Sequence, residues 1–232
     1  MKVLVLTSNS CRHKFLCDQV AKELELVGVI SEDKGDYYSA EKKFSSLVTE
    51  HFDKLRLQEK KTFDTQDFPN VPLIEVQKSE INSEDVLGWA IDLKPDAIIL
   101  FGTGILKEPW LEAFSDKIIN IHLGFSPYYR GSATLFWPFY NDDLEHLGVT
   151  IHLAVDKVDA GNILHIVKPD SLEGNYYFIT NELIKKALCE VSSVTSRFFS
   201  GEIEPRLQDV TLGHVYKKAD FCEGSLWKVI KL

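Results

Sequence analysis

Residues 120–131 read NIHLGFSPYYRG and place an amide, Asn120, two residues before an imidazole, His122, at the end of an apolar run. Residues two apart on a strand point to the same face of the sheet. The two side chains would then aim at one volume of space, where both could donate hydrogen bonds to a transient oxyanion. The alternative is that Asn120 caps a turn and that His122 is a structural histidine of the core.

Asp159 is the carboxylate best placed to join this pair. It lies in VDKVDAG (155–161), a loop between two expected strands that Gly161 helps to turn. A carboxylate beside an imidazole raises the imidazole pKa and fixes the orientation of the ring, so we expect both effects on His122. A solvated aspartate in a turn is the alternative. His152, in VTIHLAV, is a further imidazole on an expected strand, and we expect it to have a structural or supporting role.

Two other strand ends carry residues suited to ligands. In LFGTGIL (100–106), Gly102 and Gly104 give the backbone freedom to meet a flat heterocycle. The turn TSNSCRH (7–13) after the first strand offers hydroxyls and free amides at a helix start, which suit a phosphate, although ordinary helix capping explains the same residues. This turn has no G-x-G-x-x-G sequence, so NAD is not expected.

Short apolar runs alternate with helical patterns through the first two thirds of the chain. Several runs are continuous stretches of Val, Ile and Leu, as expected for strands covered on both faces. The alternation implies βαβ crossovers and an α/β fold, with a Rossmann-like, mostly parallel sheet and helices on both faces. Strands are expected at 2–7, 26–30, 72–76, 96–101 and 117–122, and helices at about 12–24, 38–61, 83–92 and 107–115.

The pattern changes after residue 131. Two further strands, a long helix and a short tail are expected, the first three at 148–155, 162–167 and about 177–200. The polar run 31–66 is too long for a tight connection, so we interpret it as an inserted helix over the sheet. We expect a catalytic domain at 1–170 that contains this insertion, and a C-terminal helix and tail at 171–232 packed on the same domain.

The 232 residues have an ordinary globular composition, with 44% hydrophobic and 26% charged residues. The net charge of −9 argues against broad binding of a nucleic-acid backbone, which needs clustered Lys and Arg. The four cysteines form no C-x-x-C pair and indicate a reducing compartment, and the dispersed histidines supply no metal-like cluster. With neither a signal peptide nor a run of about 18 apolar residues, we expect a cytoplasmic protein without a membrane span.

Taken together, NIHLGFSPYYRG, GVTIH and VDAGNIL resemble the formyltransferase family that uses 10-formyltetrahydrofolate. The family pattern is Asn-x-His, a loop of the form SLLPxxxG, and an aspartate inside D-x-G nearly forty residues further on. Its places are taken in order by Asn120, His122, Pro127, Gly131, Asp159 and Gly161. One position departs from the pattern, since Gly124 stands where the family usually has a serine.

The resemblance implies transfer of a formyl group from 10-formyltetrahydrofolate to a primary amine, without a metal. Asn120 and His122 would stabilise the oxyanion, while Asp159 would orient His122 and assist proton removal. The residues that would lie against the pterin are Phe101, Gly102, Thr103, Gly104, Ile105, Leu106, Val155, Asp156 and Val158. The residues that would meet the amine substrate are Ser8, Asn9, Ser10, Arg12, Tyr129, Arg130 and Gly131.

The stretch YYRGSATLFWP, the 31–66 run and the tail segment YKKADF are most similar to sugar N-formyltransferases of surface-polysaccharide and lipopolysaccharide pathways. The expected acceptor is therefore a nucleotide-linked amino sugar. Formylation of glycinamide ribonucleotide or of a carrier-bound amino acid, hydrolysis of formyltetrahydrofolate, and non-catalytic binding of folate or nucleotide stay open as alternatives. The 31–66 run could also recognise a protein partner, and a homodimer is a common state for such enzymes.

Overall fold

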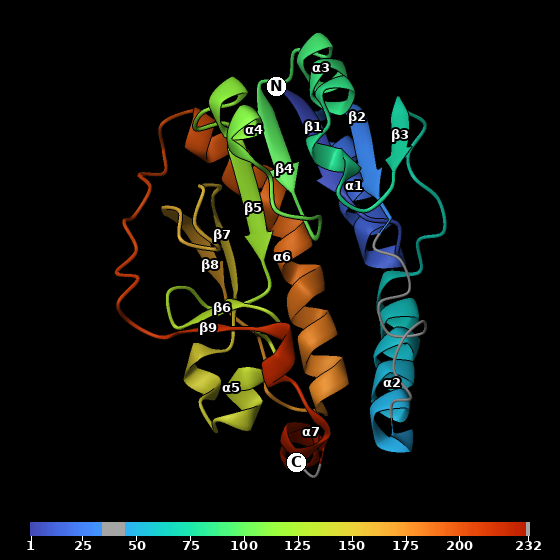
Figure 1. The fold of residues 1–232 in the computed structure, drawn as a ribbon, viewed down its shortest axis with the longest axis vertical. Coiled ribbons are helices and arrows are strands. Elements are labelled where there is room, and N and C mark those ends of the chain that lie inside the picture. The colour runs from blue at the N-terminus through green and yellow to red at the C-terminus, as the bar shows by residue number, and fades with distance from the viewer. Residues whose placement is uncertain (34–44, 231–232) are drawn as a thin grey trace.

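The computed structural model describes residues 1–33 and 45–230, which form a central sheet of seven strands (Figure 1). The strands are β1 (Lys2–Thr7), β2 (Glu25–Glu32), β3 (Leu73–Val76), β4 (Ala97–Leu100), β5 (Ile118–His122), β7 (Val149–Leu153) and β8 (Ile163–Val167). Their order is β3-β2-β1-β4-β5-β7-β8, in which the first five are parallel and β7 is antiparallel to both β5 and β8. The mostly parallel α/β sheet predicted from the sequence is confirmed.

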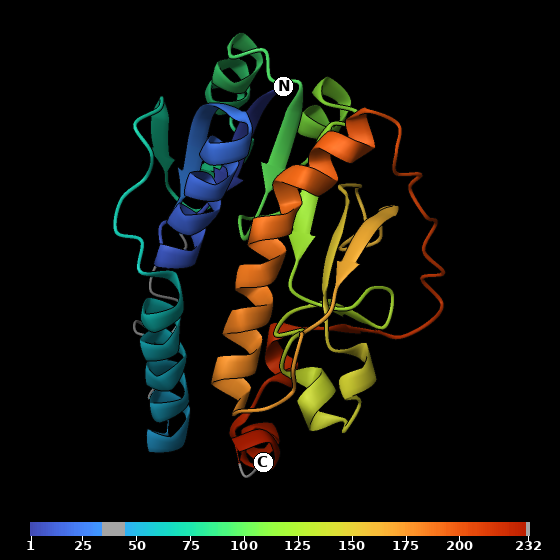
Figure 2. The ribbon, with the colours of Figure 1, turned by 180° about the vertical axis from the view of Figure 1, so that it is seen from behind.

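Helices cover both faces of this sheet, as Figure 1 and Figure 2 show from opposite sides. They are α1 (Cys11–Glu23) and α6 (Tyr176–Phe199) on one face, and α3 (Glu84–Asp92) and α4 (Glu108–Ala113) on the other. Alternate residues of β1 divide between the two cores: Val3 and Val5 pack with α1 and α6, whereas Leu4 and Leu6 pack with α3 and α4. No helix in the described part of the chain is long and apolar enough to cross a membrane.

Helix α2 (Ser46–Phe63) lies in the polar run 31–66. Residues 34–44, which include the beginning of the helix expected from residue 38, lie outside the described residues. The expectation that this helix covers the sheet is wrong, because α2 packs against α1 and α6 and extends beyond the carboxyl ends of the strands (Figure 1). One of its buried side chains, His51, contacts Tyr176 and Tyr177 of α6, which explains the placement.

Short elements that the sequence does not predict lie near the end of β5. Strands β6 (Tyr129–Gly131) and β9 (His214–Tyr216) form a parallel pair, and helices α5 (Trp137–Tyr140) and α7 (Glu223–Ile230) lie below them in Figure 1. Short 3₁₀ turns lie at Glu80–Asn82, Leu144–His146 and Lys218–Asp220. The tail that follows α6 runs along the outside of the molecule and returns to place β9 beside β6 (Figure 1, Figure 2).

Candidate active site

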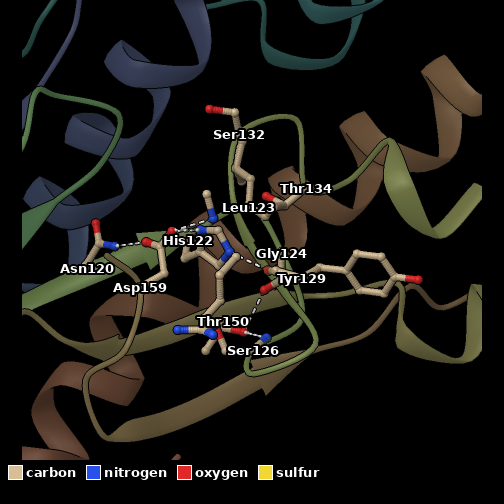
Figure 3. A network of polar contacts seen from close by, with 12 residues as sticks. Asn120, His122, Leu123, Gly124, Ser126, Tyr129, Ser132, Thr134, Thr150 and Asp159 are labelled. Atoms are coloured by element: carbon tan, nitrogen blue, oxygen red, sulfur yellow. Dashed lines mark hydrogen bonds and ion pairs between the residues drawn. The ribbon is translucent and has the colours of Figure 1, made fainter. Parts of the chain in front are cut away.

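Strand β5 presents Asn120 and His122 on one face of the sheet (Figure 3). Ile119 and Ile121 alternate with them and are buried in the core on the α1 and α6 side. The period of two along a strand therefore fixes the direction of both polar side chains. His122 is only 5% exposed, and Asn120 is half-buried.

The Asp159 carboxylate lies between these two side chains (Figure 3). Its Oδ2 is 3.3 Å from Nδ1 of His122, and its Oδ1 accepts a hydrogen bond from Nδ2 of Asn120 at 3.4 Å. The backbone N–H of Gly131 donates to Oδ2 at 2.9 Å. An amide, an imidazole and a carboxylate that are far apart in the sequence thus meet at one place.

Both ring nitrogens of His122 face oxygen acceptors, since Nε2 lies 2.8 Å from the carbonyl oxygen of Tyr129 and Nδ1 faces Asp159. Burial nevertheless lowers the pKa of His122, because the imidazolium loses its hydration and the attraction of Asp159 does not offset that loss. The expected rise of the imidazole pKa is therefore wrong. A neutral ring donates to only one of the two acceptors, so a proton delivered to the ring would complete both hydrogen bonds.

The carboxyl of Asp159 shows the opposite balance. Burial pushes the pKa of this carboxyl upward, but the nearby His152 ring, the charge of His122 and the Gly131 N–H together hold it below its ordinary value. Asp159 is therefore ionised at neutral pH. Its fixed negative charge stabilises a proton on a neighbouring imidazole, His122 or His152.

His152, on β7, orients the Asn120 amide. Its Nδ1 donates to the carbonyl of Leu153 at 2.8 Å, which leaves Nε2 to accept from the Asn120 amide nitrogen at 3.0 Å. His152 is 2% exposed, and its Nε2 lies 3.7 Å from the Asp159 carboxylate. This contact is in keeping with the supporting role expected for His152.

The loop after β5 leaves no room for a side chain at Gly124. A Cβ atom there would lie 2.4 Å from Nε2 of His122 and 2.5 Å from the carbonyl oxygen of Tyr129. The loop is held from β7, because the Thr150 hydroxyl donates to the Gly124 carbonyl at 2.6 Å and accepts from the Ser126 N–H at 2.9 Å. Gly124 therefore makes room for the hydrogen bond between the imidazole and the Tyr129 carbonyl.

The residues expected on the pterin side divide into buried and exposed groups. Phe101 and Leu106 are buried in the core, so their side chains are not open to a ligand. The residues between them form a loop in which the Gly104 N–H donates to Glu32, a carboxylate that is 2% exposed and also accepts from the Ser79 N–H at 3.0 Å. Glu32, at the end of β2, thus anchors this loop.

The loop after β7 carries the other residues expected on the pterin side. Val155 and Val158 are 42% and 44% exposed, and Asp156 is also exposed. Ala154, immediately before them, packs against the same hydrophobic cluster as Leu106. One core cluster therefore supports both expected pterin loops.

The turn after β1 lies against Phe101, because the Thr7 hydroxyl donates to the Phe101 carbonyl at 3.0 Å and the His13 ring lies 4.7 Å from the Phe101 ring. Ser8 is buried and Asn9 is exposed, while the Ser10 hydroxyl and the Arg12 Nε are buried atoms without a hydrogen-bond partner among the described residues. The Arg12 guanidinium lies 3.8 Å from Glu59 of α2. Asn9 lines a separate cavity of about 580 Å³, whose other lining residues are Lys14, Asp67, Phe68, Pro69, Asn70, Val71, Leu73 and Glu75.

The side chains of Tyr129 and Arg130 on β6 form hydrogen bonds within the protein. The Tyr129 hydroxyl donates to Asp143 at 2.8 Å, and burial raises the pKa of Tyr129 to about 12. The Arg130 guanidinium donates to the backbone carbonyls of Pro127 at 3.3 Å and Val210 at 2.9 Å. Of the β6 residues expected to meet the substrate, Tyr129 and Gly131 contact the triad, each through a backbone atom.

Several residues that support the site carry no signal in the sequence. Glu32, Thr150 and Gln208 act through backbone atoms of distant segments, which neither motif nor periodicity reveals. Glu32 shows only as an acid at the end of an apolar run. Among residues 1–33 and 45–230, no group of three or more His, Cys, Asp or Glu side chains is placed to hold a metal ion.

The sequence is similar to known formyl transferases. Residues 1–176 match the profile of a family described as formyl transferase. A methionyl-tRNA formyltransferase from Finegoldia magna is 33% identical over 94 residues, which cover 40% of this chain. The match spans less than half of that enzyme, 30% of its length.

Solved structures share the fold. A phosphoribosylglycinamide formyltransferase from Anaplasma phagocytophilum superposes with a TM-score of 0.63 at 17% identity, covering 94% of this chain and 95% of that one. A formyltransferase from Anoxybacillus kamchatkensis, crystallised with UDP-4,6-dideoxy-4-formamido-L-AltNAc and tetrahydrofolate, gives 0.58 at 19% identity and covers 99% and 98%. At such low identities the likeness concerns the fold alone.

Proposed function

Because this chain belongs to the formyl transferase family, we propose that it transfers the formyl group of 10-formyltetrahydrofolate to a primary amine. The observation that carries this proposal is the meeting of Asn120, His122 and Asp159, with 3.3 Å between imidazole and carboxylate and 3.4 Å between amide and carboxylate. A formyltransferase of the same fold contains tetrahydrofolate in its crystal structure, which supports this donor.

Asn120 stabilises the charge that develops on the formyl oxygen. Attack of a neutral amine on the formyl carbon turns the carbonyl oxygen into an oxyanion in the tetrahedral intermediate. The Asn120 N–H that reaches Asp159 at 3.4 Å turns to this oxygen, while the other N–H keeps its 3.0 Å hydrogen bond to His152. Because His152 already fixes the plane of the amide, little reorganisation is needed when the charge appears.

His122 and Asp159 move the proton that the amine loses. In the net reaction the amine loses one proton, and N10 of the folate gains one when its bond to the formyl carbon breaks. The lowered pKa of His122 leaves its ring neutral, so Nδ1 can accept this proton through the Asp159 carboxylate that faces it. The imidazolium then donates to both Asp159 and the Tyr129 carbonyl, adds positive charge beside the oxyanion, and returns the proton to N10 through Asp159.

The donor folate occupies the side of the site formed by residues 101–106 and 155–158. The exposed apolar surface of Val155 and Val158 suits one face of a pterin. Because Phe101 and Leu106 are buried, Gly102, Thr103, Gly104 and Ile105 contact the ring with their backbone atoms. Glu32 fixes that backbone through Gly104.

For the acceptor, we propose a nucleotide-linked amino sugar. The crystal structure that contains a UDP-linked formamido sugar is one of this fold, so the fold accommodates this class of product. The backbone N–H groups at the start of α1 and the partly exposed Arg12 guanidinium supply polar groups for the diphosphate. The net charge of −9 disfavours the methionyl-tRNA that the sequence relative uses. Glycinamide ribonucleotide is the second candidate, since the enzyme named for it shares the fold.

The test is to incubate the full chain with 10-formyltetrahydrofolate and single amines. The panel contains amino sugars linked to UDP, dTDP or GDP, glycinamide ribonucleotide, a carrier-bound amino acid and methionyl-tRNA. We expect amine-dependent release of tetrahydrofolate and a formyl mass on one amino sugar. Formate released without any amine would identify a hydrolase, and binding of the folate without turnover would identify a non-catalytic binding protein. Either result would overturn the proposal.

A further inference from the structure

The tail between α6 and β9 contains one buried side chain in an otherwise exposed stretch. From residue 204 to residue 215 only Gln208 is buried, with 6% of its surface exposed, whereas its neighbour Leu207 is 88% exposed. A glutamine amide removed from water needs hydrogen-bond partners. Its partners therefore show what this part of the tail holds in place.

The Gln208 amide holds the backbone of the loop that carries the catalytic carboxylate. Its Nε2 donates to the carbonyl oxygen of Asp159 at 3.2 Å and also to that of Gly161. Asp159 has a φ of 49°, in the left-handed region that residues other than glycine rarely adopt. Hydrogen bonds on the carbonyls at this strained residue hold its conformation, and with it the direction of the carboxylate.

The same tail also contacts the other side of the carboxylate. Arg206 forms a backbone bridge with Ile163 at the beginning of β8, with both hydrogen bonds at 2.8 Å. Further along, β9 pairs with β6, whose Gly131 N–H donates to the Asp159 carboxylate. The tail therefore supports both backbone segments that fix the position of this side chain.

On the basis of the formyl-transfer function proposed above, we propose that Gln208 is a positioning residue that holds the Asp159 carboxylate against His122. The Gln208 amide donates hydrogen bonds to backbone carbonyls and does not contact the reacting atoms. A displacement of about 1 Å at a reacting group costs on the order of 100-fold in rate. If Gln208 only anchored the tail, its loss would lower stability and leave the chemistry of the folded protein unchanged.

The test compares Gln208→Met, which keeps the length of the side chain but removes the amide, with Asn175→Ala. Asn175 caps α6 by accepting the Phe178 N–H at 3.0 Å, so its loss lowers stability without touching the site. For Gln208→Met we expect kcat to fall about 10- to 100-fold, with KM for both substrates changed less than about threefold. Asn175→Ala should keep the wild-type kcat.

A second measurement needs no turnover. The ring of His122 faces Asp159, His152 and Arg130, and its titration can be followed by ¹⁵N NMR on the full chain, with His122→Gln for the assignment. In Gln208→Met we expect the Asp159 carboxylate to lie farther from the His122 ring. His122 should then titrate at lower pH than in the wild type, because a nearby negative charge stabilises the imidazolium. Asn175→Ala should leave this titration unchanged.

The results separate this inference from the proposed function. If the wild type formylates no amine, the proposed function fails, while the His122 titration still tests Gln208. Wild-type kcat per folded molecule together with an unshifted titration in Gln208→Met would overturn the inference. Should Gln208→Met not fold, Gln208→Asn, whose shorter amide cannot reach both carbonyls, is expected to give the same two changes.

Discussion

Two buried imidazoles, His122 in the proposed active site at the end of β5 and His51 of α2 in the packed core, differ in their partners. Their exposed fractions are 5% and 3%. Burial lowers the pKa of both rings, and that of His51 to about 4. His122 contacts a carboxylate and a backbone carbonyl, whereas His51 lies among aromatic rings and forms a 3.0 Å hydrogen bond with the Tyr177 hydroxyl.

Burial and a shifted pKa therefore do not identify a catalytic histidine by themselves. The rings around His51 belong to Phe52, Phe136, Tyr176, Tyr177 and Phe221. None of these groups carries a charge at neutral pH, and burial together with the charge of Lys54 keeps the His51 ring neutral. At His122 the ionised Asp159 is such a group, and the set of partners decides the role of the ring.

The largest expected contrast comes from removing one side chain in each region. Asn120→Ala removes the donor for the oxyanion, so we expect kcat for formyl transfer to fall by about 10² to 10³. His51→Phe should keep kcat within about threefold, because the aromatic pack tolerates another ring. Tetrahydrofolate release by both variants, with circular dichroism as the check on folding, measures the contrast. Equal losses of kcat would remove the distinction between the two regions.

A smaller effect is expected at Gly124, where the imidazole and the loop meet. Gly124→Ser places a side chain within 2.4 Å of Nε2 of His122, so either the ring or the loop must move. We expect the free energy of unfolding to fall by about 1–3 kcal/mol and kcat to fall about tenfold. Urea denaturation and steady-state kinetics measure the two changes.

Gly88→Ala is the matched control for this substitution. Gly88 lies inside α3 with nothing within 4 Å of an added Cβ, so alanine should raise the free energy of unfolding by up to about 1 kcal/mol. Its kcat should be unchanged. A serine at position 124 that costs neither stability nor activity would mean that the loop accommodates it without disturbing His122.

The effect that is smallest at neutral pH concerns His51, in the packed region. Since the pKa of His51 is about 4 when folded and 6.5 ordinarily, the unfolded chain binds a proton first as the pH falls. The stabilisation from the neutral ring is complete above pH 6.5 and is lost toward pH 4. His51→Phe should flatten the decline of the unfolding free energy over this range, by at most about 1.4 kcal/mol per pH unit. Identical slopes in both proteins would contradict the low pKa.

The sequence predicted the regular half of the fold well and the irregular half poorly. The runs that became β1 and β4 consist mostly of Val, Ile and Leu, and β5 is apolar apart from Asn120 and His122, so the burial of these strands between two helix layers can be predicted from their sequences. Strands β6 and β9 have three residues each and no periodicity. They form by pairing across 85 residues of sequence, from Tyr129 to His214, which local pattern does not encode.

The candidate site also has a part that the sequence predicted and a part that it did not. The spacing of Asn120 and His122 and the resemblance around Asp159 named side chains that do lie together. The pKa of His122 was expected in the wrong direction, because the sequence shows the neighbouring charge but not how completely the ring is buried. Gln208 and Glu32 were missed since each acts on the backbone of a segment 49 or 72 residues away.

We propose that His122 and Asp159 act as one unit on the proton that leaves the amine. A double-mutant cycle tests this directly, with kcat/KM for formyl transfer measured for His122→Ala, Asp159→Ala and the double variant. If the pair is a unit, the double variant should be about as slow as the slower single variant. Losses that multiply, so that the double variant is slower by the product of the two factors, would show that the residues act independently and would contradict this account.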